Sequence, residues 1–100
     1  MVFITQLIYI LEGQEAVFNQ FEAMVIPRIS KYNGQLLLRL RPGLEAYIES
    51  HVEKPYEVHL VEFETESDFI NYMQDEERKA FLHLKDQSIQ SVLVIKGVKL

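Results

Sequence analysis

Four short runs of mainly apolar residues constrain the fold of this chain more than any other sequence feature. The first run, residues 2–11, is interrupted only by Thr5 and Gln6. A strand that is apolar on both faces is buried on both faces. Further runs occupy residues 35–41, 56–63 and 89–98. The sequence therefore predicts four strands, of which the first and fourth are apolar on both faces.

Helical patterns fill two of the three gaps between these runs. Apolar residues three or four positions apart share one helix face; here they are Phe18, Phe21, Val25, Ile29 and Tyr32. Glu15, Asn19, Gln20 and Glu22 are expected mostly on the rest of the helix. Pro27 predicts a kink near residues 23–26, because it removes one backbone donor. Asn33-Gly34 predicts the stop, since Gly takes the left-handed conformation cheaply.

The second helical region follows the third strand. Thr65 is suited to cap its first helix, and Asp75-Glu76-Glu77 to begin another piece at a new angle. Residues 42–55 form a polar, acidic connection with a few apolar anchors. The order is therefore strand, helix, strand, strand, helix, strand.

This order predicts a ferredoxin-like βαββαβ sandwich of the α+β class, with a four-stranded antiparallel sheet. No linker divides the chain, so we expect one domain over residues 1–100. The helices of such a fold cover only one sheet face. In a chain this short, the expected cover for the other apolar face is a second copy, which gives a homodimer. We expect strands 35–41 and 89–98 to supply much of that interface.

Composition excludes several classes of function. Ten Lys and Arg against fifteen Asp and Glu give a net charge of −5, the wrong sign for a general nucleic-acid binder. The chain has no Cys for a thiolate nucleophile or a cysteine zinc site. The apolar runs are too short to cross a membrane, and no signal peptide is evident. These features predict a cytoplasmic protein that binds neither nucleic acid nor membrane.

Short motifs spread over most of the chain resemble the dimeric α/β-barrel superfamily, which includes antibiotic-biosynthesis monooxygenases. Within it, the chain is most similar to an uncharacterised family of bacterial proteins of about this length. The matching residues are Pro27, Tyr32-Asn33-Gly34, Leu37-Leu38-Arg39, Glu62-Phe63, Tyr72 and the ending Val94-Ile95-Lys96-Gly97-Val98. The resemblance implies a ferredoxin-like barrel dimer that binds a small molecule between sheet and helices. It also implies monooxygenase-like or isomerase-like chemistry without a bound cofactor.

Arg39 and Glu62 are the first candidate pair, because both lie in strands expected to be at least half buried. A buried charge is costly unless it is paired. The second and third strands are neighbours in this fold, so the two residues could meet. One interpretation is a structural ion pair, and the other is an Arg that grips a carboxylate ligand, oriented by the Glu.

His59 and Tyr72 are the candidate catalytic residues. In the third strand, Glu57, His59, Val61 and Phe63 point one way, whereas Val58, Leu60 and Glu62 point the other. A buried His near a carboxylate can act as a general base, although a neutral core His is the alternative. Tyr72 could close the same cavity, which Tyr9 and Thr5 could line. His51 and His83 show no metal spacing, so no metal site is expected.

Two hypotheses for function follow. In the first, a homodimeric barrel binds a small, partly apolar or anionic molecule, a His or Tyr moves a proton, and Arg39 holds an anionic group. In the second, the dimer is a non-catalytic interaction or sensing module.

Overall fold

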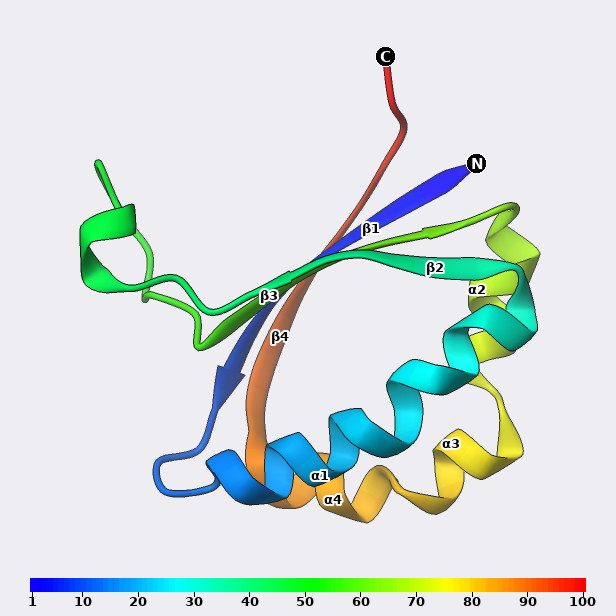
Figure 1. Cartoon of the computed structure of the whole chain (residues 1–100), viewed down its shortest axis with the longest axis horizontal. Helices are drawn as coiled ribbons and strands as arrows, with labels where there is room; N and C mark the ends of the chain where they lie inside the picture. The colour runs from blue at the N-terminus through cyan, green and yellow to red at the C-terminus, as the bar shows by residue number, and fades with distance from the viewer.

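A computed structural model describes all residues, 1–100, and its four strands form one antiparallel sheet in the order β2-β3-β1-β4 (Figure 1). The strands are β1 (Val2–Ile10), β2 (Gly34–Leu40), β3 (Glu57–Phe63) and β4 (Ile89–Gly97). The helices are α1 (Glu15–Val25), η1 (Ile26–Tyr32, a 3₁₀ helix), η2 (Leu44–Ala46, also 3₁₀), α2 (Glu66–Met73), α3 (Glu76–Ala80) and α4 (Leu82–Ser88). The predicted ferredoxin-like α+β arrangement is confirmed.

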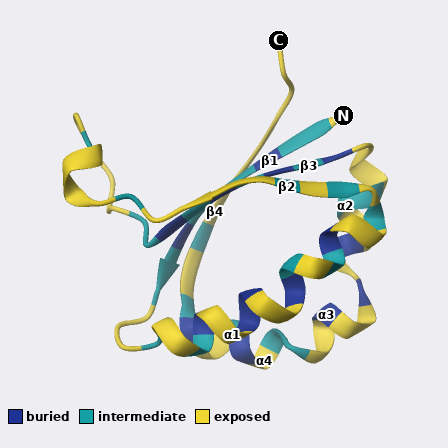
Figure 2. Ribbon diagram, in the orientation of Figure 1, coloured by how far each residue is buried: buried dark blue, intermediate teal, exposed yellow.

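The main helices all lie on one side of the sheet, where the buried residues collect (Figure 2). Ile4, Ile8, Phe18 and Phe63 are almost wholly buried between the two layers. Alternation places Ile4 and Ile8 of β1 with Val61 and Phe63 of β3 on this helix-covered face. No helix of the structure is both long and apolar enough to cross a membrane.

The first helical region changes from an α-helix to a 3₁₀ helix at the place where the sequence predicted a kink. The α-helix ends at Val25 and continues as η1, with Pro27 in the first turn of the 3₁₀ segment, where a missing N–H costs little. The terminating residue differs from the prediction, because Asn33 rather than Gly34 takes the left-handed conformation, with φ 57°. Gly34 is needed for another reason: a Cβ there would lie 2.6 Å from the Phe63 ring.

The predicted Thr65 cap and the predicted helix start at Asp75 are both confirmed. The Thr65 hydroxyl accepts a hydrogen bond from the Asp68 backbone N–H at 3.1 Å. The Asp75 carboxylate accepts one from the Arg78 backbone N–H at 2.7 Å. The second hydrogen bond fixes the first turn of α3, and it thereby fixes the position of Arg78 in that turn.

A β-bulge in β2 decides which face its basic residues occupy. Leu36 pairs with Val61, but the register then shifts, so that Leu38 pairs with Leu60 and Arg39 with His59. Without the extra residue, Arg39 would lie opposite Val58 on the other face. The bulge therefore brings Arg39 to the same face as Glu57 and His59.

The sheet face away from the helices is apolar and open. Two rows of paired residues cross all four strands on it: Leu40, Val58, Leu7 and Leu93 form one row, and Leu38, Leu60, Thr5 and Ile95 form the other. Leu38, Leu40, Leu93 and Ile95 are exposed, on the edge strands β2 and β4. The connection between β2 and β3 projects away from the body of the molecule (Figure 1).

Candidate active site

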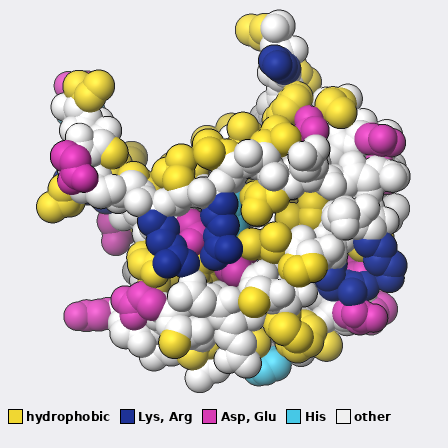
Figure 3. All heavy atoms as spheres, viewed as in Figure 1, with side chains coloured by type: hydrophobic (Ala, Val, Ile, Leu, Met, Phe, Trp, Pro, Cys, Tyr) yellow, Lys and Arg dark blue, Asp and Glu magenta, His cyan; other side chains and the backbone are white.

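A cavity of about 100 Å³ lies between the sheet and the helices. Fourteen of its nineteen lining residues are hydrophobic. They come from β1, β3 and β4 on one side and from α1, η1 and α2 on the other. The polar remainder is Gln6, Glu22, His59, Arg78 and Lys85. In the space-filling view, apolar atoms surround a hollow beside a group of basic and acidic side chains (Figure 3).

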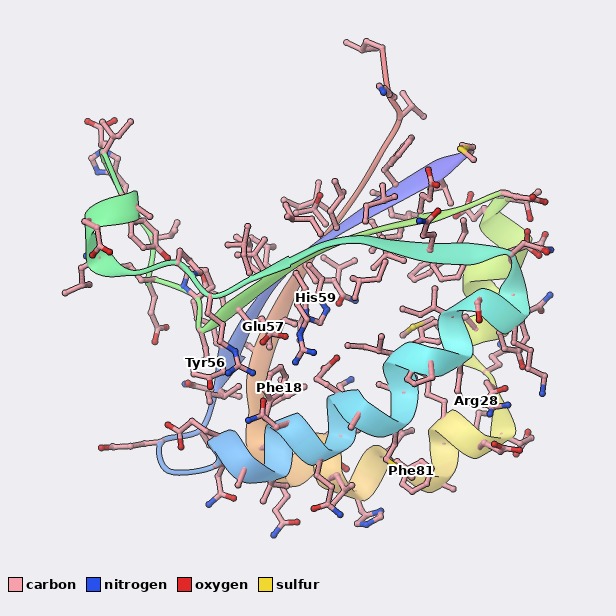
Figure 4. The ribbon with its side chains drawn as sticks, viewed as in Figure 1. Phe18, Arg28, Tyr56, Glu57, His59 and Phe81 are labelled. Atoms are coloured by element: carbon pink, nitrogen blue, oxygen red, sulfur yellow. The ribbon has the colours of Figure 1, made fainter.

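Glu57 organises the polar end of this region. Its side chain is fully buried and accepts hydrogen bonds from Arg39 Nε at 2.9 Å, from Arg41 Nε at 2.7 Å and from His59 Nε2. Burial alone would raise the pKa of Glu57, but these hydrogen bonds together lower it below its usual value. Glu57 is therefore a fixed negative charge whose oxygens are all engaged. Figure 4 places Glu57 and His59 side by side, pointing from β3 toward α1.

His59 is a neutral imidazole held in one orientation. Burial lowers its pKa, and the nearby Glu57 carboxylate opposes that effect only in part. Because an ionised carboxylate can only accept hydrogen bonds, Nε2 of His59 carries the proton and donates the hydrogen bond to Glu57. The other ring nitrogen, Nδ1, is then a free base. This arrangement, a carboxylate that orients a basic imidazole, is suited to proton transfer.

Glu22 is a candidate functional residue that the sequence patterns did not single out. It is only 5% exposed, lines the cavity and forms no hydrogen bond through its side chain. Burial, with a further contribution from the Glu57 charge, raises the pKa of Glu22 to about 7. A carboxyl group with this pKa can give or take a proton near neutral pH. Its spacing was the available signal, since Glu22 follows Phe18 by four positions and precedes Val25 by three.

Tyr72 closes the cavity on the side of α2. It is buried, and its hydroxyl donates a hydrogen bond to the Val25 backbone oxygen at 3.2 Å. Burial raises the pKa of its phenol, so the phenol is protonated at neutral pH. The Arg78 guanidinium lies 5.2 Å from the centre of the Tyr72 ring. The predicted placement of Tyr72 in the cavity wall is correct.

Glu62, Tyr9 and Thr5 do not reach the cavity. Glu62 pairs with Gln35 and points to the open sheet face, so the expected Arg39–Glu62 ion pair is wrong, and Arg39 binds Glu57 instead. Thr5 and Tyr9 alternate with Ile4 and Ile8, which places them on the open face as well. The Tyr9 hydroxyl donates to the Glu53 backbone oxygen at 2.8 Å. Any role of these three residues in ligand binding stays a prediction, and it would be on that face.

Three donor groups could in principle surround a metal ion. An oxygen of Glu22, an oxygen of Glu57 and a ring nitrogen of His59 all lie within 4.8 Å of one another. However, both oxygens of Glu57 already accept hydrogen bonds from Arg39 and Arg41, whose positive charges would repel a cation. The cluster is better suited to holding and moving protons.

Comparisons with solved structures support the fold. A dabb family protein with a ferredoxin-like fold, from Mesorhizobium loti, matches with a TM-score of 0.68 and 14% sequence identity. The match covers 99% of this chain and 96% of that one. A dimeric protein of unknown function with a ferredoxin-like fold, from Bacteroides fragilis, matches at 0.71 and 13%, covering 98% and 95%. A provisionally assigned antibiotic biosynthesis monooxygenase from Nitrosomonas europaea matches at 0.71 and 10%, covering 100% and 99%.

These likenesses define the class of fold: a ferredoxin-like α+β domain that resembles the dimeric α/β-barrel and antibiotic-biosynthesis-monooxygenase proteins. The resemblance that the sequence motifs indicated is confirmed at this level. No family model and no curated protein matches the chain. At identities of 10 to 14%, the structural neighbours establish the fold and leave the chemistry to the site itself.

Proposed function

We propose that this protein is a homodimeric α/β barrel that binds a small, partly apolar molecule in the cavity between sheet and helices. His59 moves a proton on the bound molecule, without a bound cofactor. The observation that carries this proposal is the pair of buried titratable groups, His59 and Glu22, which lie close together in the wall of a mainly apolar cavity.

The electrostatic division of roles within the cluster supports proton transfer. Glu57 stays ionised and orients His59, whereas Glu22 titrates near neutral pH. Groups with separated pKa values in one cavity can act as base and acid in turn. We assign the base to His59 and the second proton exchanger to Glu22. Tyr72 is proposed as the wall against which the ligand is held, with its protonated hydroxyl as a further catalytic candidate.

The reaction class that fits these groups is proton abstraction from a carbon acid. The developing negative charge would lie among Arg78, Lys85 and protonated Glu22, which all line the cavity. Isomerase-like chemistry needs no other reagent. Monooxygenase-like chemistry would begin with the same abstraction: the carbanion adds dioxygen, the peroxide takes back a proton, and loss of water from the hydroperoxide leaves a carbonyl at the oxidised carbon, so that the substrate itself is the reductant. Arg39 acts here as a positioning residue, because it holds Glu57 rather than facing the cavity.

Homodimer formation is supported by the open sheet face. Its two apolar rows cross all four strands and end in exposed Leu and Ile side chains at both edges. The Bacteroides fragilis neighbour with this fold is described as dimeric. A second copy seated on this face would enclose Thr5 and Glu62 in the interface.

The experiment that tests the proposal is exchange of carbon-bound hydrogen in D₂O. Acetylacetone, a small carbon acid, is followed by NMR with wild-type protein and with the variants His59→Asn and His51→Asn. His51 lies in the projecting loop with an exposed side chain, so it is the matched control. We expect His59→Asn to slow exchange by about a hundredfold or more and His51→Asn to leave it unchanged. Equal rates for all three would favour the non-catalytic module instead.

A further inference from the structure

Arg78 is a buried cation without a carboxylate partner. The residue is 8% exposed, and its Nε atom has no hydrogen-bond partner. One terminal nitrogen reaches the Met73 backbone oxygen at 3.4 Å, which is a long contact, and the guanidinium otherwise lies over the Tyr72 ring. A buried guanidinium normally finds an anion, because the loss of hydration is otherwise uncompensated.

The other three arginines of the chain are all paired. Arg28 binds Asp75 and Glu77, and Arg39 and Arg41 share Glu57. Asp75, three positions before Arg78, accepts a hydrogen bond from the Arg78 backbone N–H. Its carboxylate forms an ion pair with Arg28, not with the Arg78 guanidinium. Glu22 also lines the cavity, and the positive charge of Arg78 acts to lower the pKa of Glu22, but no ion pair joins the two side chains. Arg78 is thus the one arginine of the chain whose guanidinium has no carboxylate partner and is available to an anionic ligand.

We propose that Arg78 binds the carboxylate of the cavity ligand, and that the ligand class is small monocarboxylic acids with an apolar body. This inference rests on the proposed function and specifies its substrate class. The guanidinium presents donors in a planar fork that matches a carboxylate. Lys85, which also lines the cavity, adds a second positive charge to its wall. The ring of Tyr72 and the aliphatic wall enclose the apolar body.

The size of the cavity limits that body to a few carbons. A dry cavity of about 150 Å³ holds a benzene molecule. The volume of about 100 Å³ here is smaller and suits a body of three or four carbons. Butanoate and pentanoate, each compared with its neutral amide, are therefore suitable probes. The amide keeps the shape of the acid and removes its charge.

Titrations followed through the methyl signals of Ile29 and Ile89, which line the cavity, test the inference. Wild-type protein should bind each acid at least tenfold more tightly than its amide. Arg78→Met should weaken binding of the acids by about ten- to a hundredfold and leave the amides almost unaffected. Lys85→Met, which removes the other cavity cation, should weaken binding of the acids less than Arg78→Met does, and Lys79→Met, at an exposed position on α3 outside the cavity, should leave the preference for acids unchanged. Arg78→Met should also fold, because it removes an unpaired buried charge, and Arg78→Lys, with a smaller loss of affinity, serves as a second variant.

Each contrary outcome has a separate meaning. If amides bind as tightly as acids, or if Arg78→Met retains the preference, the inference is overturned and the proposed cavity binding stands. Loss of the preference in Lys85→Met but not in Arg78→Met would equally overturn the assignment to Arg78. If neither acid nor amide shifts the cavity methyl signals, the proposed function fails and this inference fails with it.

Discussion

Glu22 and Glu57 have carboxyl oxygens within 4.8 Å of each other, and their pKa values are displaced in opposite directions. Burial and the Glu57 charge raise the pKa of Glu22 to about 7. Burial acts on Glu57 too, but hydrogen bonds from Arg39, Arg41 and His59 outweigh it and lower its pKa. One carboxylate is therefore permanently charged, and the other titrates in the range where proton transfer is useful.

The first prediction concerns Glu22→Gln and the pH dependence of stability. Between pH 4.5 and about 7 the folded protein holds the Glu22 proton that the unfolded chain has lost, so the free energy of unfolding falls as pH rises. Above pH 7 the loss is complete, on the order of 3 kcal/mol. Glu22→Gln should lack this decline. Urea unfolding of both proteins at pH 5 and pH 8 measures it.

Other charged groups around Glu22 must be considered in that comparison. Glu57 and His59 face it from β3, Arg39 from β2, Arg78 from α3, and Lys85 lies in the same cavity. Of these, His59 has a pKa lowered by burial, so its effect on stability has the opposite sign and appears as pH falls below about 6.5. That contribution is present in both proteins, and their difference isolates Glu22. An identical pH profile for the two would contradict the raised pKa.

The second prediction separates the observed ion pair from the one expected from sequence. Glu57→Gln leaves Arg39 and Arg41 next to each other without a counter-charge, and should cost about 3 kcal/mol or more. Arg39→Ala should cost less, about 1 kcal/mol, because Arg41 and His59 still hold Glu57 and Arg39 is partly exposed. Glu62→Gln should change little. Chemical denaturation of the three variants measures these differences, and a double-mutant cycle should give coupling for Arg39 with Glu57 and none with Glu62.

The strands, helices and caps were predictable because they depend on local periodicity. Thr65 caps α2 as its position in the sequence indicated, and Asp75 stands at the predicted start of α3. The partner of Arg39 was not predictable, because it depends on one bulge in β2, and a shift of one residue exchanges the two faces of a strand. Glu22 was missed for another reason. Its charge suggested an exposed position, although its spacing from Phe18 and Val25 put it on the buried face.

The third prediction concerns Asp75, which links η1 to α3. Its carboxylate binds Arg28 Nε at 2.6 Å, accepts from the Tyr32 hydroxyl and caps α3. Hydrogen bonding to Arg28 is the main cause that lowers the pKa of Asp75, so its stabilisation is present above pH 3.8 and lost as pH falls below it. At pH 7, Asp75→Ala should cost about 2 kcal/mol. Thermal unfolding at pH 7 and pH 3 checks this, with Asp86→Ala, an exposed position on α4, as the control.

The fourth prediction concerns the open sheet face and the proposed homodimer. Leu93 lies at the edge of one apolar row, opposite Leu7, with half of its surface exposed. Burying a lysine there against a second copy would remove a charge from water without a partner. Leu93→Lys should therefore convert the dimer into a monomer that keeps its circular dichroism spectrum. Leu44→Lys makes the same chemical change in the projecting connection, where Leu44 is 74% exposed, and should leave the dimer intact. Native mass spectrometry at micromolar concentration distinguishes the two states. A wild-type monomer, or a Leu93→Lys dimer, would mean that the second sheet face does not pack against another copy.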